Sequence, residues 1–500
     1  MLPFYTDSFI KIFPEIFIGL SICYLLVFCS FYGTKPFIKT LDIQLVSHRA
    51  SFFILFLVSF LLLNSFFISG FSFFGTFFVS FSTQIIKLFS LVFVLSFFFF
   101  GSSTFHKQYP CSFEFFILVL FSIFGIFIIV NSNDLLGIYL GLELQSLCIY
   151  ALVSSSKKSA FSTEAGLKYF VMGAFSSGLL LFGFSLIYGF AGTSHISVLS
   201  NLFSVNFFDI SSIFINIGVL LFFIGILFKL AVSPWHMWAP DVYEGAPSNV
   251  AIFISISPKI FIFYVLVKLS YSCFFSFSFI WGPFLLACGF LSIVFGSFGA
   301  LSQKKLKRFF VFSSISHIGY CIVSLSCSSF LGLQNSFFYI FLYLIISFPL
   351  WSLFVLTLSF RQKGPIYLDE LEQFFKYNSF YSFTFCIILF SIAGIPPLAG
   401  FYSKIFVFFS LMESNIVLAS VIIVLLGTLG SVYYLKVIKI FFFTTFFNRI
   451  NSYLSKRSFF IEFSFFQSLI ISYFFIFILF FGINPSFPYI VAHLITLENY

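Results

Sequence analysis

Long apolar runs, separated by short polar segments, follow one another along the whole chain. A helix that crosses a bilayer needs about 20 predominantly apolar residues, and this criterion predicts fourteen membrane-spanning helices. No polar connection is long enough to bury a core of its own, so no separate soluble domain is expected. The expected helices cover 14–32, 50–70, 84–101, 113–131, 134–153, 165–190, 211–232, 247–270, 276–300, 309–328, 333–360, 379–411, 415–442 and 460–483, and the second and third of these nearly merge.

The positive charges support an even number of helices. Eighteen of the 25 Lys and Arg lie in the odd-numbered connections, whereas the even-numbered connections hold almost none. Basic residues accumulate on the inner side of a membrane, so this alternation predicts that both termini lie on the outer side. In a mitochondrion, the inner side is the matrix.

The composition agrees with a membrane protein. The 500 residues are 60% hydrophobic and 8% charged, whereas soluble domains carry about 25% charged residues. The net charge of +9 is dispersed over short connections, which argues against a nucleic-acid-binding groove. The nine cysteines form no C-x-x-C pair, and the chain contains no nucleotide-binding or metal-ligand motif. The chain is therefore expected to bind neither NADH nor ATP, and to carry no electrons itself.

Two of the expected helices are interrupted by proline. Pro234 follows the seventh in LFKLAVSPWHMWAP, and Pro396 and Pro397 lie within the twelfth in SIAGIPPLAGFYSK. Proline removes a backbone donor, and the freed carbonyls are tolerated at membrane depth only where protein or cavity water satisfies them. The breaks fall in the fourth helix of helices 4–8 and of helices 9–13, which predicts two inverted repeats with an ion site at each break. Ordinary proline kinks are the alternative.

Ionisable residues deep inside apolar runs are the main candidates for function. They are Glu143, Lys229, Lys259 and Lys404. A charge at the middle of a membrane helix costs from about 2.5 to more than 10 kcal/mol, so acid and base groups in series indicate an ion or proton path. Glu143 and Lys229 can form an ion pair whose making and breaking moves a proton, because a neighbouring opposite charge restores the ionised forms that burial disfavours. A static buried salt bridge is the alternative.

Three further groups have weaker signals. His317, in FSSISHIGYC, can accept a proton at one ring nitrogen and donate at the other, or it is a packed hydrogen-bonding residue. Glu164 and Lys168 are four residues apart near the start of the sixth helix, a spacing that is also typical of helix-surface stabilisation. His236 belongs to the polar segment 236–244 just past the first break, which can shape a proton entrance or form a polar turn.

Several unusual strings occur in one order: TEAGLKYF, KLAVSPWHMWAPDVYEGAP, SSISHIGY and GIPPLAGFYSK. They resemble the antiporter-like membrane subunits of respiratory complex I (NADH:ubiquinone oxidoreductase), in the subunit 2 group that includes the bacterial N subunit. The resemblance runs from about residue 113 to about residue 443, and the remaining helices match in hydropathy only. It implies an all-α polytopic membrane protein with about 14 transmembrane helices, inverted five-helix repeats at helices 4–8 and 9–13, and broken helices 7 and 12. The implied segments are 1–112 with three helices, 113–270 with the first repeat, 271–443 with the second repeat, and 444–500 with the last helix and tail.

The resemblance also implies a proton path, driven by NADH oxidation and quinone reduction elsewhere in the complex. The implied roles are the helix 5 glutamate for Glu143, its lysine partner on helix 7 for Lys229, the central lysine of helix 8 for Lys259, the helix 10 histidine for His317, and the helix 12 lysine leading to the exit for Lys404. A free-standing or Mrp-type cation/proton antiporter subunit is the alternative function for the same residues, and a structural scaffold is another.

The implied partners are neighbouring antiporter-like subunits of the membrane arm, a small multi-carboxylate subunit and membrane lipids, with no nucleic acid. No cofactor is implied in this chain, since NADH, FMN, iron–sulfur clusters and ubiquinone belong to other subunits. The 92 Phe point to a T-rich genome and hence to an organelle-encoded protein. The expected location is the mitochondrial inner membrane, with both termini on the intermembrane-space side.

Overall fold

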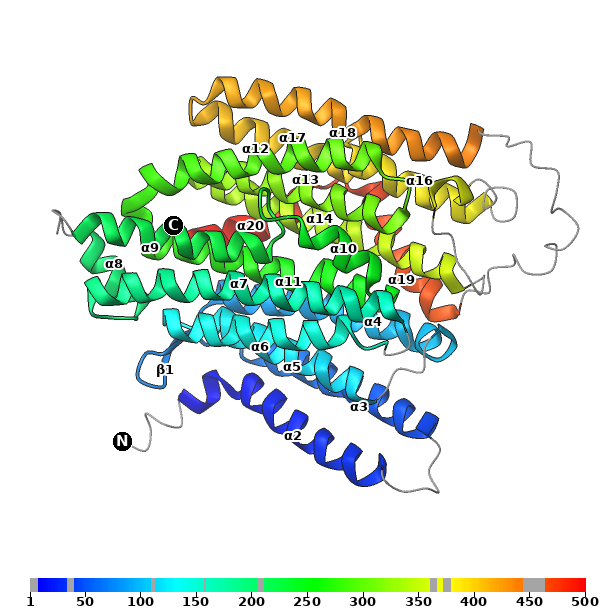
Figure 1. Cartoon of the computed structure of the whole chain (residues 1–500), viewed down its shortest axis with the longest axis horizontal. Coiled ribbons are helices and arrows are strands. Elements are labelled where there is room, and N and C mark those ends of the chain that lie inside the picture. The colour runs from blue at the N-terminus through cyan, green and yellow to red at the C-terminus, as the bar shows by residue number, and fades with distance from the viewer. Residues whose placement is uncertain are drawn as a thin grey trace, which may run out of the picture. The chain divides into compact units, whose positions relative to one another are not determined.

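The computed structural model describes residues 8–33, 40–108, 113–156, 159–204, 211–359, 367–371, 379–443 and 464–500. Nearly all of these residues are helical (Figure 1). The chain divides into two compact units. The first unit comprises Met1–Leu230, Gly245–Trp281 and Leu494–Tyr500, and the second comprises Ala231–Glu244 and Gly282–His493.

The first unit is a bundle of long helices with one small hairpin. The strands β1 (Gly70–Ser72) and β2 (Phe77–Val79) pair antiparallel in the connection between α3 and α4. The helices are α2 (Phe13–Gly33), α3 (Thr40–Asn64), α4 (Phe81–Gln108), α5 (Phe113–Asn131), α6 (Leu135–Val153), α7 (Ala160–Ala191), α8 (Ile196–Ser204), α9 (Ser211–Lys229) and α11 (Ser248–Lys268), followed by the π-turn η1 (Leu269–Cys273) and the 3₁₀ turn η2 (Phe275–Phe277).

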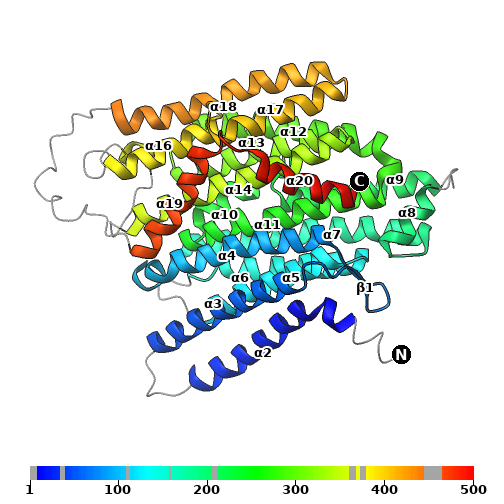
Figure 2. The same cartoon turned by 180° about the vertical axis from the view of Figure 1, so that it is seen from behind.

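Helix α11 forms the core of the first unit. All of its residues are buried, and it contacts α4, α5, α6 and α9. A helix that is apolar on all sides is stable only when it is surrounded in this way or by lipid. Figure 2 shows α4 between α3 and α11, so α4 packs directly against this core and α3 packs against α4.

The second unit is built around two central helices. Helices α13 and α14 are almost entirely buried, and α17 packs against both of them. The elements of this unit are most of α10 (Trp238–Gly245) and α12 (Ser278–Ser302), α13 (Leu306–Ser326), α14 (Phe330–Ser359), the turn η3 (Leu368–Leu371), α16 (Ser379–Ala393), α17 (Ala399–Glu413), α18 (Val417–Phe443), α19 (Phe465–Phe480) and the first part of α20 (Ser486–Asn499).

The predicted all-α membrane fold is confirmed. In the described part of the chain, eleven helices are long and apolar enough to cross a membrane, and three shorter apolar helices cover 213–229, 379–393 and 465–480. Each of the fourteen predicted runs overlaps one of these helices. The number of helices that cross the membrane, the inverted repeats and the four predicted segments stay predictions.

Hydropathy alone did not predict the short elements. The hairpin, α8, α10 and α20 were not expected, and the predicted second helix ends at Asn64 instead of continuing to residue 70. The sequence SGFSFFGTFFVS is apolar enough to suit a helix, but Gly75 has a left-handed φ of +85° and the aromatic residues around it suit strands. A turn therefore separates the two runs that nearly merge in the sequence.

The predicted orientation depends partly on residues outside the described part of the chain. Those basic residues are Lys35, Lys39, Lys157, Lys158, Arg361, Lys363, Lys376, Arg449, Lys456 and Arg457. The outer location of both termini therefore stays a prediction.

Helices α5 and α6 approach each other closely through two glycines. A Cβ on Gly125 would lie 3.0 Å from the backbone nitrogen of Gln145, and a Cβ on Gly141 would lie 2.6 Å from Cγ1 of Ile129. Small residues allow membrane helices to come into backbone contact, which strengthens van der Waals packing where lipid supplies no hydrophobic driving force. This contact fixes the position of α6, the helix that carries Glu143.

Candidate functional site

Glu143 and Lys229 are brought together inside the first unit. Glu143 lies on α6, and Lys229 is the last residue of α9. The Lys229 ammonium nitrogen lies 3.5 Å from Oε1 of Glu143 and donates a second hydrogen bond to the carbonyl of Leu142 at 3.2 Å. The side chains are 8% and 25% exposed, so the lysine is buried and the carboxylate keeps partial access to its surroundings.

The chain leaves its helical path directly after this lysine. Helix α9 ends at Lys229, and residues 230–237 contain no α-helix. Ala231 has a left-handed φ of +59°, and Pro234 cannot donate a backbone hydrogen bond. The last carbonyls of α9 therefore lack partners within their own helix, and this polar helix end lies beside the Glu143–Lys229 pair.

His236 is buried in the polar segment after the break. Its Nδ1 lies 2.8 Å from the Ser233 hydroxyl, and its ring stacks against Phe295 with centroids 5.7 Å apart. The residue is only 3% exposed. His236 thus holds the turn between the break and α10, and its part in proton entry stays a prediction.

An ion-pair network joins α10 to the start of α13. Glu244 bonds both Lys305 and Arg308, and Arg308 donates a further bond to Asp241 at 2.7 Å. Burial acts to raise the pKa of the Glu244 carboxyl, but the two cations outweigh it and hold this pKa below its usual range. Lys307 also donates to the backbone carbonyl of Glu244 at 3.3 Å. The segment is therefore fixed in place by charge.

Lys259 lies in the middle of α11. It is 5% exposed and directly follows Pro258, which lies inside the helix. Because proline lacks an N–H, the carbonyl four residues earlier, on Ile254, has no helical donor. A buried lysine and an under-bonded carbonyl thus occur together on the helix at the core of the first unit.

Lys404 binds the helix end created by the second break. Helix α16 ends at Ala393, and the Lys404 ammonium on α17 donates to the Ala393 carbonyl at 2.7 Å. Gly394 follows with a left-handed φ of +89° and packs against the lysine side chain. The last carbonyls of a helix lack internal partners and carry partial negative charge, so this end stabilises an ammonium. The ammonium also lies 6.0 Å from the centre of the Tyr320 ring.

His317 is enclosed by tyrosines in the second unit. Its Nδ1 lies 2.7 Å from the hydroxyl of Tyr339 on α14, and its Nε2 lies 3.1 Å from the hydroxyl of Tyr434 on α18. Tyr343 stacks on the ring with centroids 5.4 Å apart. Both ring nitrogens are therefore engaged, and a proton can enter at one and leave at the other. Sequence reasoning missed these tyrosines, whose signal is a hydroxyl placed in an otherwise apolar helix.

Glu164 and Lys168 form an exposed pair on α7. Oε1 of Glu164 lies 2.8 Å from the Lys168 ammonium, and the side chains are 59% and 49% exposed. Exposed pairs with this spacing contribute about 0.3–0.5 kcal/mol to helix stability. Among the residues that the structure describes, no three His, Cys, Asp or Glu side chains are placed to hold a metal ion.

Buried ionisable residues at interrupted helices inside an apolar bundle are typical of ion-translocating membrane proteins. The family model described as NADH:quinone oxidoreductase/Mrp antiporter, transmembrane, matches residues 132–430. The chain belongs to this family. The match contains all five residues of the predicted path, namely Glu143, Lys229, Lys259, His317 and Lys404.

Individual relatives agree with the family model. NADH-ubiquinone oxidoreductase chain 2 of Marchantia polymorpha is 34% identical over 456 residues, which cover 88% of this chain and 90% of the relative. NADH-quinone oxidoreductase subunit N of Pelagibacter ubique (strain HTCC1062) is 36% identical over 371 residues, which cover 74% and 73%. A chain of the respiratory complex I structure from Thermus thermophilus superposes with a TM-score of 0.76 at 24% identity, over 96% of this chain and 99% of that chain. The resemblance to the antiporter-like subunits of complex I is therefore confirmed.

We predict that Gly394→Ala disturbs the Lys404 site. A methyl group there would lie 3.0 Å from Cδ and 3.1 Å from Nζ of Lys404, and the left-handed φ adds about 1–2 kcal/mol for a residue with a Cβ. We expect a loss of stability of at least that size, measured as earlier thermal onset of protease cleavage of this chain in the purified assembly. Gly178→Ala on α7 is the control, because no atom lies within 4 Å of its added Cβ. Equal resistance of the two variants would contradict the prediction.

We predict that Glu244→Gln destabilises the second unit in a pH-dependent way. The lowered pKa of Glu244 means that its ion pairs stabilise the fold above the ordinary glutamate pKa, about 4.3, and lose this effect as the pH falls through the folded-state pKa. The expected difference is about 0.5–2 kcal/mol for two partly exposed pairs.

Protease resistance of wild type and variant between pH 7 and pH 4 measures this difference. It should be constant above about pH 5 and should begin to decrease toward pH 4, because the folded-state pKa lies below the ordinary glutamate value. Glu413→Gln, at an exposed position at the end of α17, is the control and should have little effect. A difference that grows on acidification would contradict the role assigned to Glu244.

Proposed function

We propose that this chain is a proton-translocating membrane-arm subunit of NADH:ubiquinone oxidoreductase. The observation that carries the proposal is the buried Glu143–Lys229 pair, located where α9 stops, within the segment that the family model matches. NADH oxidation and quinone reduction then occur in other subunits, with NADH, FMN, iron–sulfur clusters and ubiquinone bound there, and this chain contributes proton movement alone.

The ion pair supplies a switch of suitable size. At 3.5 Å and an effective dielectric constant of 20, the attraction between the two charges is about 5 kcal/mol before desolvation is counted. Moving one charge across 100 mV costs about 2.3 kcal/mol. When the pair opens, Lys229 stays buried but loses its counter-charge. Burial without a counter-charge disfavours the charged ammonium, so release of its proton is favoured. Closing the pair favours the protonated lysine again.

The groups beyond the pair can pass a proton on within their own units. In the first unit, Lys259 on α11 is a buried base that can take up and release a proton. In the second unit, His317 with the hydroxyls of Tyr339 and Tyr434 offers alternating donors and acceptors. Lys404 on α17 is the last base of the proposed path, with the carbonyl at the end of α16 stabilising its charged form.

The partners and the location of this chain are inferred from the same family. We infer neighbouring antiporter-like subunits, a small multi-carboxylate subunit and membrane lipids as the partners of this chain. We further infer the mitochondrial inner membrane, since the chain is Phe-rich and is 34% identical to the Marchantia polymorpha ubiquinone-linked chain 2. Both termini then lie on the intermembrane-space side.

A second candidate function is an Mrp-type cation/proton antiporter subunit, because the matching family includes both kinds of protein. Blue-native electrophoresis of gently solubilised membranes, with in-gel NADH oxidation and mass spectrometry, separates the two. Peptides of this chain in a large NADH-oxidising band support the first function. A small band without NADH activity, together with sodium-dependent transport by the chain, supports the second.

We predict that Lys229→Ala lowers the number of protons moved per electron while electron transfer is partly retained. The change removes the cation of the proposed switch and leaves no redox group affected. Liposomes containing the assembled complex, with NADH oxidation and acidification recorded together, measure the ratio. An unchanged ratio in a fully assembled variant would contradict the proposed function. Simultaneous Glu143→Gln and Lys229→Met with normal pumping would favour a scaffold role.

A further inference from the structure

A second buried ionic cluster lies in the first unit, outside the predicted proton path. Oε1 of Glu15, on the first turn of α2, lies 2.5 Å from the ammonium of Lys87 on α4. The side chains are 6% and 1% exposed. The amide of Asn131, the last residue of α5, donates to the same carboxylate oxygen at 2.8 Å. Three helices thus meet at one acid–base pair.

Lys268 joins this group from α11. Its ammonium donates to the carbonyls of Ser132 at 2.8 Å and Val130 at 3.4 Å, the two residues that flank Asn131. We call Glu15, Lys87, Asn131 and Lys268 the N-terminal cluster. It contains two amines and one carboxyl, so the fully ionised cluster carries one positive charge in a buried site. A site with an unbalanced buried charge is poised to change its protonation.

Two acceptors in the cluster lack donors. Oε2 of Glu15 and Oδ1 of Asn131 are buried and have no hydrogen-bond partner within the described residues. Leaving a buried acceptor unsatisfied costs about 1–3 kcal/mol. The ionised carboxylate of Glu15 is therefore incompletely hydrogen-bonded. Since hydrogen bonds to the charged form are what favour it, this shortage lowers the cost of the neutral acid.

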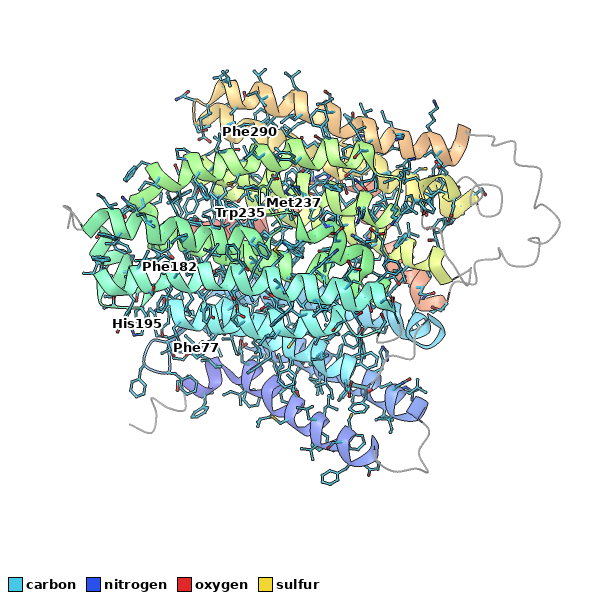
Figure 3. The ribbon with its side chains drawn as sticks, viewed as in Figure 1. Phe77, Phe182, His195, Trp235, Met237 and Phe290 are labelled. Carbon is cyan, nitrogen blue, oxygen red and sulfur yellow. The ribbon has the colours of Figure 1, made fainter. Side chains whose placement is uncertain are left out.

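The cluster lies near one end of its helices. Glu15 and Lys87 belong to the N-terminal parts of α2 and α4, and Asn131 and Lys268 are the last residues of α5 and α11. Helix α4 begins at Phe81, and with a rise of 1.5 Å per residue Lys87 lies about 9 Å along the helix from that start. The segment after Asn131 pairs with Phe77 on β2 and with His195, both labelled in Figure 3. The His195 side chain is 40% exposed, so this end of the unit reaches accessible polar groups.

We propose that the N-terminal cluster is a proton-binding site through which the first unit exchanges protons with the side of the membrane where these helix ends meet. In the exchange step, an N–H bond of the Lys87 ammonium breaks and an O–H bond forms on Oε1 of Glu15. The product is a neutral amine and a neutral acid. The amine then accepts a proton from the interior of the unit, and Glu15 releases its proton toward the helix ends. The inference rests on the proposed function, since it adds a site to the same proton translocation.

The test compares three variants of this chain in the assembled complex: Glu15→Gln, Lys87→Met and the double variant. Each is reconstituted in liposomes, and protons moved per NADH oxidised are recorded beside Lys229→Ala. Lys11→Met is the control, because within the described residues this lysine donates to a backbone carbonyl, that of Phe71, at an exposed site of the same N-terminal segment. We expect the single and double variants to lose the same fraction of protons per NADH as Lys229→Ala, and the control to lose none.

The double variant separates proton exchange from a purely structural salt bridge. A single change leaves one buried charge unpaired and can impair assembly, whereas the double variant leaves none in the pair. Assembly and full pumping in the double variant would overturn the proposal. Infrared difference spectra during turnover give an independent signal, because a carboxylic acid band that is lost in Glu15→Gln supports protonation of Glu15, and an unchanged spectrum opposes it.

The cluster site and the proposed function can be disproved separately. If Lys229→Ala lowers the proton yield and the cluster variants do not, the cluster site is wrong and the proposed function stands. If none of the variants, including Lys229→Ala, lowers the yield, the proposed function itself is wrong.

Discussion

The constraint on which this structure depends is the burial of lysine ammonium groups among apolar helices. An ammonium taken out of water must find several acceptors or lose its proton. Carboxylates are scarce in this chain, and backbone carbonyls within a helix already accept from their own helix, as the Leu142 carbonyl does beside its bond from Lys229. Carbonyls at helix ends lack such internal donors and are the most available acceptors. Lys404 accordingly binds the last carbonyl of α16, and Lys268 binds carbonyls at the end of α5.

This constraint explains why the helices break where they do. Pro396, Pro397 and the left-handed Gly394 end α16 within an apolar run, and the free carbonyl of Ala393 then accepts from Lys404. The end of α9 at Lys229 is a comparable case, with Glu143 from the neighbouring helix as counter-charge. At the second break the two features support each other, because the break frees the Ala393 carbonyl and Lys404 supplies a donor for it.

Much of this could be predicted from the sequence, but not all. Lys229 and Lys404 lie deep in apolar runs, where a charge is so costly that it signals a function by itself. Glu15 and Lys268 lie near the ends of their runs, where a long polar side chain usually reaches the membrane surface. Only the packing of α2, α4, α5 and α11 within the first unit buries them. The tyrosines around His317 were missed for a related reason, since hydropathy counts their rings and ignores their hydroxyls.

The two acid–base pairs of the first unit differ in a way that suits different tasks. In the Glu143–Lys229 pair the charged atoms are 3.5 Å apart, and the carboxylate side chain is 25% exposed, so the partners separate at lower cost than those of a fully enclosed pair. In the Glu15–Lys87 pair they are 2.5 Å apart, and both side chains are almost fully enclosed. Separation there would leave two buried charges unpaired, at a cost of several kcal/mol per ion. Transfer of the proton across the short contact neutralises both groups without moving either. The looser pair is therefore suited to respond to conformational change, and the tighter pair to hold and release a proton in place.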